Sequence, residues 1–222
     1  MEGSYKYMNP NSISSLVQHW RKLSGAIHLD DLSVFTSHQH SFNLDFPPPA
    51  YIGDIENAPV VLLDANGGYD PSITPMEFSK SGFLEKYIEL LRSPKAVDPV
   101  EISPYYAKRN YASLIKSDRL ALVNAVAYRS SSISRPEDAA NRRIVEKLPS
   151  TQVHRIWLRN ELIPAAKAGK RLIVAHRNSL WNFKKKEGPI HGVIFTTNAV
   201  SADLSKDALA KISAFINGQA WK

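Results

Sequence analysis

The sequence contains no cysteine among its 222 residues. This absence excludes disulfides, thiolate nucleophiles and cysteine-held zinc or iron–sulfur centres, so any catalysis must use oxygen or nitrogen groups. We expect no cofactor and no metal. The chain also lacks a basic and apolar leader with a cleavage site, and no apolar run approaches the length that a bilayer requires. These absences predict a soluble, cytoplasmic protein without a membrane partner.

Acidic side chains are outnumbered by basic ones, since 21 Asp and Glu stand against 28 Lys and Arg and leave a net charge of +7. A basic surface attracts polyanions such as nucleic acid, although a merely solvated surface shows the same excess. With 43% hydrophobic residues, the chain can bury one good core. We therefore expect a single domain over residues 1–222, as a monomer, with nucleic acid as its partner.

Short apolar runs alternate with helical patterns, and no internal repeat interrupts them. The pattern predicts four strands: the first lies within 59–69 and ends in a glycine-rich loop, and the others are at 120–128, 172–175 and 192–197. Helices are expected over 12–23, over 75–91 with an interruption at Gly82, from about 135, over 151–168 and over 205–216. Residues 1–45 would form an N-terminal helix and an extended lead-in. This order predicts an α/β fold, a three-layer αβα arrangement around a short, mostly parallel four-stranded central sheet.

Polar residues follow three of these strands, at the carboxyl ends where open α/β sheets bind ligands. The first such loop, 64–69, contains Asn66 followed by Gly67 and Gly68. The glycines let the backbone approach a ligand closely or adopt positive φ, and the amide supplies donors and an acceptor. The loop either orients a water or polar ligand or is a tight turn capped by Asn66. It is not a phosphate loop, because neither glycine signature of such loops is present.

The other two loops span residues 124–132 and 176–181. Asn124 lies within the apolar run LALVNAVAY, where an unpaired buried amide would cost about 1–3 kcal/mol, so it needs a partner. That partner is either neighbouring backbone or the edge of a bound base. His176 directly follows the strand 172–175, where an imidazole can carry a proton, donate to a developing oxyanion or serve the structure alone.

Three segments in this order resemble the uracil-DNA glycosylase superfamily. The stretch 47–71, PPPAYIGDIENAPVVLLDANGGYDP, is similar to the approach and first motif of the divergent members, with Asn66 at the central position. The run LALVNAVAY is similar to the strand that carries the pyrimidine-reading asparagine, and Asn124 matches that asparagine. The segment HRNSL, residues 176–180, is similar to the late motif H-P-S-P-L. The resemblance covers most of the chain from about Phe42 onward.

The resemblance implies base flipping followed by scission of an N-glycosidic bond. Asn66 would position the attacking water and His176 would stabilise the leaving base, while Asp64 would act as a substitute base or repel the sugar-phosphate. The base would be bound by five residues: Asn124, Phe78, Gly67, Gly68 and Tyr69. Six further residues would contact the DNA duplex: Arg177, Ser179, Leu180, Trp181, Lys184 and Lys185. For Phe78 a core position, and for the lysines a solvated loop, is the alternative.

The chain departs from the family at Gly67, which replaces proline, at Asp64, which replaces glycine, and at Arg177 and Asn178, which replace Pro-Ser. Two functions therefore remain open. One is a DNA glycosylase acting on uracil or a related base, and the other is a glycosylase-fold protein that binds nucleic acid, a nucleotide or a protein without catalysis. A metal-dependent hydrolase using His38 and His40 is a third and weaker hypothesis, since no matched carboxylate motif accompanies them.

Overall fold

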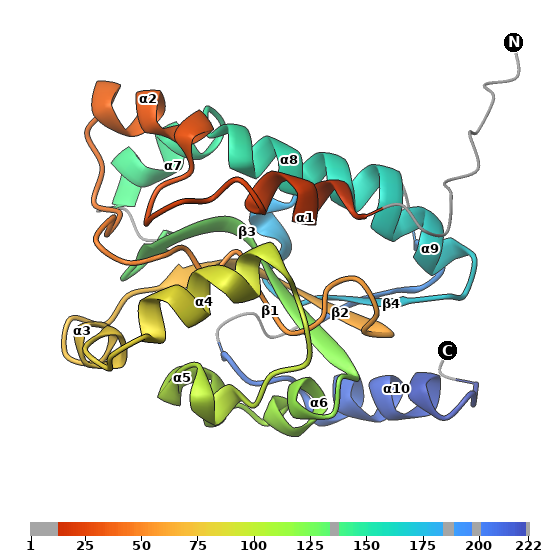
Figure 1. The fold of residues 1–222 in the computed structure, drawn as a ribbon. Coiled ribbons are helices and arrows are strands. Elements are labelled where there is room, and N and C mark those ends of the chain that lie inside the picture. Colours follow the sequence, from red (N-terminus) through yellow and green to blue (C-terminus); the bar gives the residue numbers. More distant parts are fainter. Residues whose placement is uncertain (1–12, 134–137, 184–188, 197–200, 221–222) are drawn as a thin grey trace, which may run out of the picture.

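A computed structural model describes residues 13–133, 138–183, 189–196 and 201–220. Within them a five-stranded sheet runs in the order β1-β3-β2-β4-β5, with helices on both of its sides (Figure 1). Its strands are β1 (Tyr51–Ile52), β2 (Val60–Gly68), β3 (Leu120–Ser130), β4 (Leu172–Ala175) and β5 (Val193–Phe195). β2 pairs in parallel with β3 and β4, and β4 with β5, whereas β1 is antiparallel to β3. The α/β prediction is confirmed.

The prediction of four strands missed β1. Its two residues are too few to show an alternating pattern, and the strand exists because Tyr51 and Ile52 lie opposite Val123 and Leu122 of β3. The backbone N–H of Asn124 donates to Ala50 O at 3.0 Å, which extends this pairing by one hydrogen bond. The sheet is therefore mixed, with one antiparallel strand at its edge.

The helix predicted over 151–168 is continuous but not regular. It comprises α8 (Pro149–Trp157), a π-helical turn (Leu158–Leu162) and α9 (Ile163–Lys167). Pro164 lacks the N–H for an i to i−4 bond and crowds the carbonyl four residues earlier, which accounts for the wider turn before it. The helix stops before Gly169, whose φ of +71° suits the predicted C′ position.

Gly82 divides the predicted helix 75–91 into α3 (Thr74–Phe78) and α4 (Phe83–Arg92), and its φ of +72° marks the break. The predicted N-terminal helix is α1 (Ser15–Trp20). α2 (Leu29–Ser37) was not predicted; it buries Asp31 and Phe35, whereas Leu29 and Leu32 are exposed. The remaining helical elements are a 3-10 turn (Pro99–Glu101), α5 (Pro104–Ala107), α6 (Ala112–Lys116), α7 (Ala139–Val145), a second 3-10 turn (Asn178–Leu180) and α10 (Lys206–Ile216).

The layers pack around one connected hydrophobic core. α1 and α2 lie against α8, which in turn packs on β3, while α6 contacts β3 and α10 contacts β4 (Figure 1). β2, β3 and β4 are buried almost throughout, as strands covered on both faces must be. Among the described residues, no helix has the length and apolar character needed to cross a bilayer.

Candidate functional site at the carboxyl edge of the sheet

Residues 64–68, expected to form a loop, belong to strand β2. The strand pairs with β3 up to Gly68, which lies opposite Ser130, and the register shifts between Asn66 and Gly67. The expectation was wrong because two glycines are typical of turns, whereas here they continue a strand through an irregularity. The site is therefore built on the end of a strand rather than on a free loop.

Gly67 is required by packing against the chain itself. A Cβ built on it would come within 2.3 Å of Pro49 Cγ and 3.0 Å of Ala127 O. Gly68 has nothing within 4 Å of its equivalent position. We expected the glycines to let the backbone approach a ligand, whereas the close approach at Gly67 is to Pro49 of the same chain, and Gly67 does not line the cavity described next.

A cavity of about 480 Å³ opens at the carboxyl ends of β2 and β3. Because β3 lies on one side of β2 and β4 on the other, the strand order reverses there, and such a point is where open α/β sheets form ligand crevices. Its wall comes from the strand ends, from the segment 69–77, from the region around α5 and from the residues after β4. The lining residues include Asn66, Tyr69, Glu77, Tyr105, Arg109, Arg129 and Arg177.

Cationic side chains dominate the charged groups of this wall, which has Lys108, Arg109, Arg129 and Arg177 against Asp70 and Glu77. The guanidinium of Arg129 is buried, donates through Nε to Pro47 O at 3.1 Å and lies 5.3 Å from the Phe78 ring centroid. Arg109 is partly exposed, donates through Nε to Tyr105 O and lies 4.7 Å over the Tyr105 ring. The wall thus offers fixed positive charge beside aromatic surface.

Glu77 is a buried carboxylate in the same wall, and Ser103 donates its hydroxyl to it. Burial raises the pKa of Glu77, while the Ser103 hydrogen bond and the charge of Arg129 oppose this shift. A carboxyl group with a raised pKa in a cleft is a candidate proton donor or acceptor. Sequence analysis missed Glu77 because it lies in a short helix far from any strand end. Arg129 and Ser130, by contrast, fall in the interval 124–132 that the strand-end rule had selected.

Asn66 is the one predicted catalytic residue that lines the cavity. Its Nδ2 donates to Ser130 Oγ at 2.8 Å and to Gly67 O at 2.9 Å, so the amide is held in a fixed orientation. Asp64 lies deeper, 4% exposed, and its Oδ1 accepts from the N–H of Ala65. Gly68, Tyr69 and Arg177, also predicted site residues, share the cavity wall with Asn66.

The other two predicted polar residues are buried outside the cavity and hydrogen-bonded within the protein. Asn124 Nδ2 donates to Pro49 O at 2.6 Å, which is the backbone partner that the sequence left as one alternative. His176 is 2% exposed; its Nε2 donates to Ser201 O at 2.7 Å and its Nδ1 lies 2.9 Å from Thr196 Oγ1. The three strand ends do converge at one edge of the sheet, but of Asn66, Asn124 and His176 only Asn66 lines the cavity.

Of the predicted aromatic and DNA-contacting residues, some pack into the protein interior and others are exposed. Phe78 stacks on Phe46, with ring centroids 5.0 Å apart, and packs against the core. Trp181 is buried and donates its indole N–H to Asp64 O, so it cannot enter a duplex without leaving the core. Leu180 is half-buried and Ser179 is exposed. Lys184 and Lys185 lie outside the described residues.

His38 and His40 are not joined by a carboxylate in the part of the chain that the structure describes. His38 Nδ1 donates to Val34 O at 2.9 Å and its Nε2 lies 2.7 Å from Lys147 Nζ, while His40 packs edge-on against Phe35. The single group of three His, Asp or Glu residues close enough to share a metal ion, among the described residues, is elsewhere, at His19, His28 and Asp30.

No protein-family model matches the chain, and neither the curated proteins nor the solved structures contain a match. The glycosylase resemblance therefore stays a prediction.

Proposed function

We propose that the protein binds nucleic acid or a nucleotide in the 480 Å³ cavity at the carboxyl edge of its sheet, as a glycosylase-like fold whose pocket serves recognition. The observation that carries this proposal is the composition of one wall, where Arg109, Arg177 and the buried Arg129 stand beside Tyr69 and Tyr105. Cationic groups pair with phosphate, and aromatic faces stack on bases without regard to their identity.

The volume of the cavity and the net charge of the chain support this choice of ligand. A volume of about 480 Å³ lies within the range of small-molecule pockets, about 300–1,000 Å³, and suits a nucleoside with its phosphate. The basic sequence, with a net charge of +7, adds long-range attraction for a polyanion. Asn66, fixed by Ser130, would then contact the polar edge of the base.

Binding is tested with a fluorescently labelled single-stranded oligonucleotide and, separately, a nucleoside monophosphate. We expect Arg177→Gln and Arg109→Gln to weaken binding about tenfold each, the loss of one good phosphate contact, and to flatten its salt dependence. Arg159→Gln is the matched control, because Arg159 is exposed in the π-helical turn and does not line the cavity. Equal loss in the control, or no loss in the cavity variants, overturns the proposal.

Base release is the second candidate function, and the position of Asn66 favours it. The amide of Asn66, held by Ser130, is suited to orienting a water. Glu77, a carboxyl group with a raised pKa in the same cavity, is suited to accepting a proton from that water. We expect this function to show as abasic product from a panel of uracil-containing, mismatched and damaged oligonucleotides, reduced by Asn66→Ala and by Glu77→Gln. Binding without any abasic product would leave recognition as the function.

A further inference from the structure

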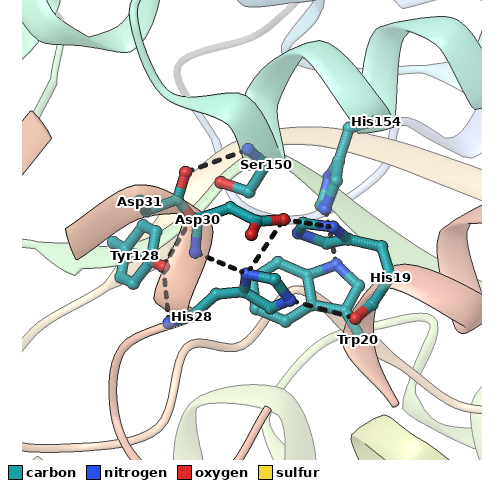
Figure 2. A network of polar contacts seen from close by, with 8 residues as sticks. All are labelled: His19, Trp20, His28, Asp30, Asp31, Tyr128, Ser150 and His154. Carbon is teal, nitrogen blue, oxygen red and sulfur yellow. Dashed lines mark hydrogen bonds and ion pairs between the residues drawn. The ribbon is translucent and has the colours of Figure 1, made fainter. Parts of the chain in front are cut away.

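The layer formed by α1, α2 and α8 contains a second cluster of polar side chains, and none of its members lines the cavity. Figure 2 shows His19 at the end of α1, with His28 and Asp30 at the start of α2. One ligand atom from each of these three residues lies within 4.8 Å of the other two. Asp30 Oδ2 is 3.8 Å from His19 Nδ1 and 3.6 Å from His28 Nδ1.

We propose that His19, His28 and Asp30 bind a divalent transition-metal ion, with zinc as the natural probe, and that the ion clips the end of α1 to the start of α2. Imidazole and carboxylate are the ligands that such ions share. Bound at about 2.0–2.2 Å, tetrahedral ligand atoms stand roughly 3.3–3.5 Å apart. The distances from Asp30 Oδ2 to the two Nδ1 atoms exceed this by only a few tenths of an ångström, and a water would complete the four ligands from the side of Asp30, which is half-exposed.

His28 has the hydrogen bonding of a metal ligand. Its Nε2 donates to the backbone carbonyl of His19 at 3.1 Å, which places the ring proton there and leaves the lone pair on Nδ1, facing Asp30. Histidine ligands in proteins are commonly fixed by such a bond from the other ring nitrogen to a carbonyl. Nδ1 now accepts from the N–H of Asp30 at 3.2 Å, a contact that the ion would replace.

The backbone around His28 is held by a buried network. Tyr128 accepts from the N–H of His28 at 3.1 Å and donates to Asp31 Oδ2 at 2.6 Å, and Asp31 Oδ1 accepts from the N–H of Ser150 (Figure 2). These bonds join the start of α2 to β3 and α8. His28 is therefore positioned before any ion arrives, which lowers the entropic cost of binding.

His19 is the ligand that must move. Its ring stacks on that of His28 with centroids 3.8 Å apart and planes at 19°, so the in-plane lone pairs run side by side instead of converging. His19 is 7% exposed, and its Nε2 has no hydrogen-bond partner among the described residues. A buried ring nitrogen without a partner is uncommon, and a turn of the ring toward Asp30 would break no hydrogen bond at Nε2.

The protonation state of His19 favours coordination. Burial, together with the nearby His28, lowers the pKa of His19 to about 4, so the ring is neutral at neutral pH and its lone pair is available. The adjacent carboxylate of Asp30 supplies the negative charge that a dication needs. No cysteine competes for the ion anywhere in the chain.

The test is titration of untagged, chelator-treated full-length protein with Zn²⁺ by calorimetry, with Co²⁺ absorption as an independent report of four-coordinate geometry. We expect one ion per chain, a rise in the unfolding temperature, and a loss of affinity of about tenfold or more in Asp30→Asn. Asp30→Asn tests the site without disturbing the core, because this side chain is half-exposed. His28→Gln should abolish binding.

Two matched controls keep the result specific. Asp207→Asn removes an exposed carboxylate from the first turn of α10, and His38→Gln removes a histidine at the end of α2. Both should bind the ion like the unaltered protein. Absence of binding at millimolar Zn²⁺, equal affinity in Asp30→Asn, or loss of binding in His38→Gln overturns the proposal.

Discussion

Arg177 and Asp64 face each other across two neighbouring parallel strands, with Arg177 Nε 3.6 Å from Asp64 Oδ1. Asp64 lies in β2 and is 4% exposed, whereas Arg177 follows β4 and reaches the cavity wall. The buried carboxylate therefore positions the cation that we assign to phosphate, and at the same time offsets part of its charge.

This pair separates the two candidate functions. If the cavity serves recognition, Asp64→Asn should raise the affinity for an anionic oligonucleotide severalfold, since Arg177 loses a competing anion while the amide keeps the shape of the side chain. Fluorescence anisotropy at two salt concentrations measures this, with Asp207→Asn as the control for removal of a remote charge. A loss of base release in the same variant would instead assign catalysis to Asp64.

Gly67→Ala should destabilise the protein by about 1–3 kcal/mol, because the new methyl group would overlap Pro49 and force the segment before β1 away from β2. Gly68→Ala, one residue later, should change the free energy of unfolding by less than about 0.5 kcal/mol, since its Cβ position is open. Urea unfolding of both variants provides the comparison. Similar free energies for the two would contradict the packing role of Gly67.

Asn124→Ala should cost about 1–3 kcal/mol of stability by leaving Pro49 O unpaired in the interior, and should leave nucleotide affinity unchanged. Urea unfolding and ligand titration, run on the same preparation, measure both quantities. Asn160→Ala, at an exposed position, is the control. If Asn124 reads a base, the outcome reverses: affinity falls and stability is kept.

Stability should fall as the pH drops below the ordinary pKa of histidine. Complete burial lowers the pKa of His154 from 6.5 to about 3, and its Nε2 accepts the indole N–H of Trp20 at 2.8 Å, so a proton there would oppose another donor. Between these two pKa values, His154 therefore binds a proton in the unfolded chain but not in the folded chain. The contribution is fully present above about pH 6.5 and is lost as the pH falls toward about 3, at about 1.4 kcal/mol per pH unit.

In the His154→Gln variant, the glutamine keeps a hydrogen-bond acceptor for Trp20 but cannot titrate. The free energy of unfolding of this variant should therefore depend less steeply on pH, and the difference in slope should correspond to the uptake of one proton. Urea titrations at several pH values between about 7 and about 4.5 measure the two slopes. His19, whose pKa is also lowered, contributes a second, separate part of the slope in both proteins. Parallel curves for the two proteins would show that His154 takes up a proton without unfolding.

Local signals in the sequence were sufficient for the strands and the main helix ends. The four parallel strands are near-continuous apolar runs. Gly82, just before α4, and Gly169, just after α9, both have positive φ, which a residue type alone can indicate. They were not sufficient for β1 or α2. β1 depends on pairing with β3, and α2 is anchored by the buried Asp31 and Phe35, which contact Ser150 and Tyr128 far along the chain.

For the site, the sequence by itself determined which strand ends would meet, because carboxyl ends of parallel strands must share an edge. It could not determine which side chains there would face open space. Only tertiary packing decided that Asn66 and Arg177 line the cavity, that Asn124 and His176 turn to internal partners, and that Arg129 and Glu77 join the wall. The physical reason is that each orientation depends on partners far along the chain, such as Pro49 for Asn124 and Ser201 for His176.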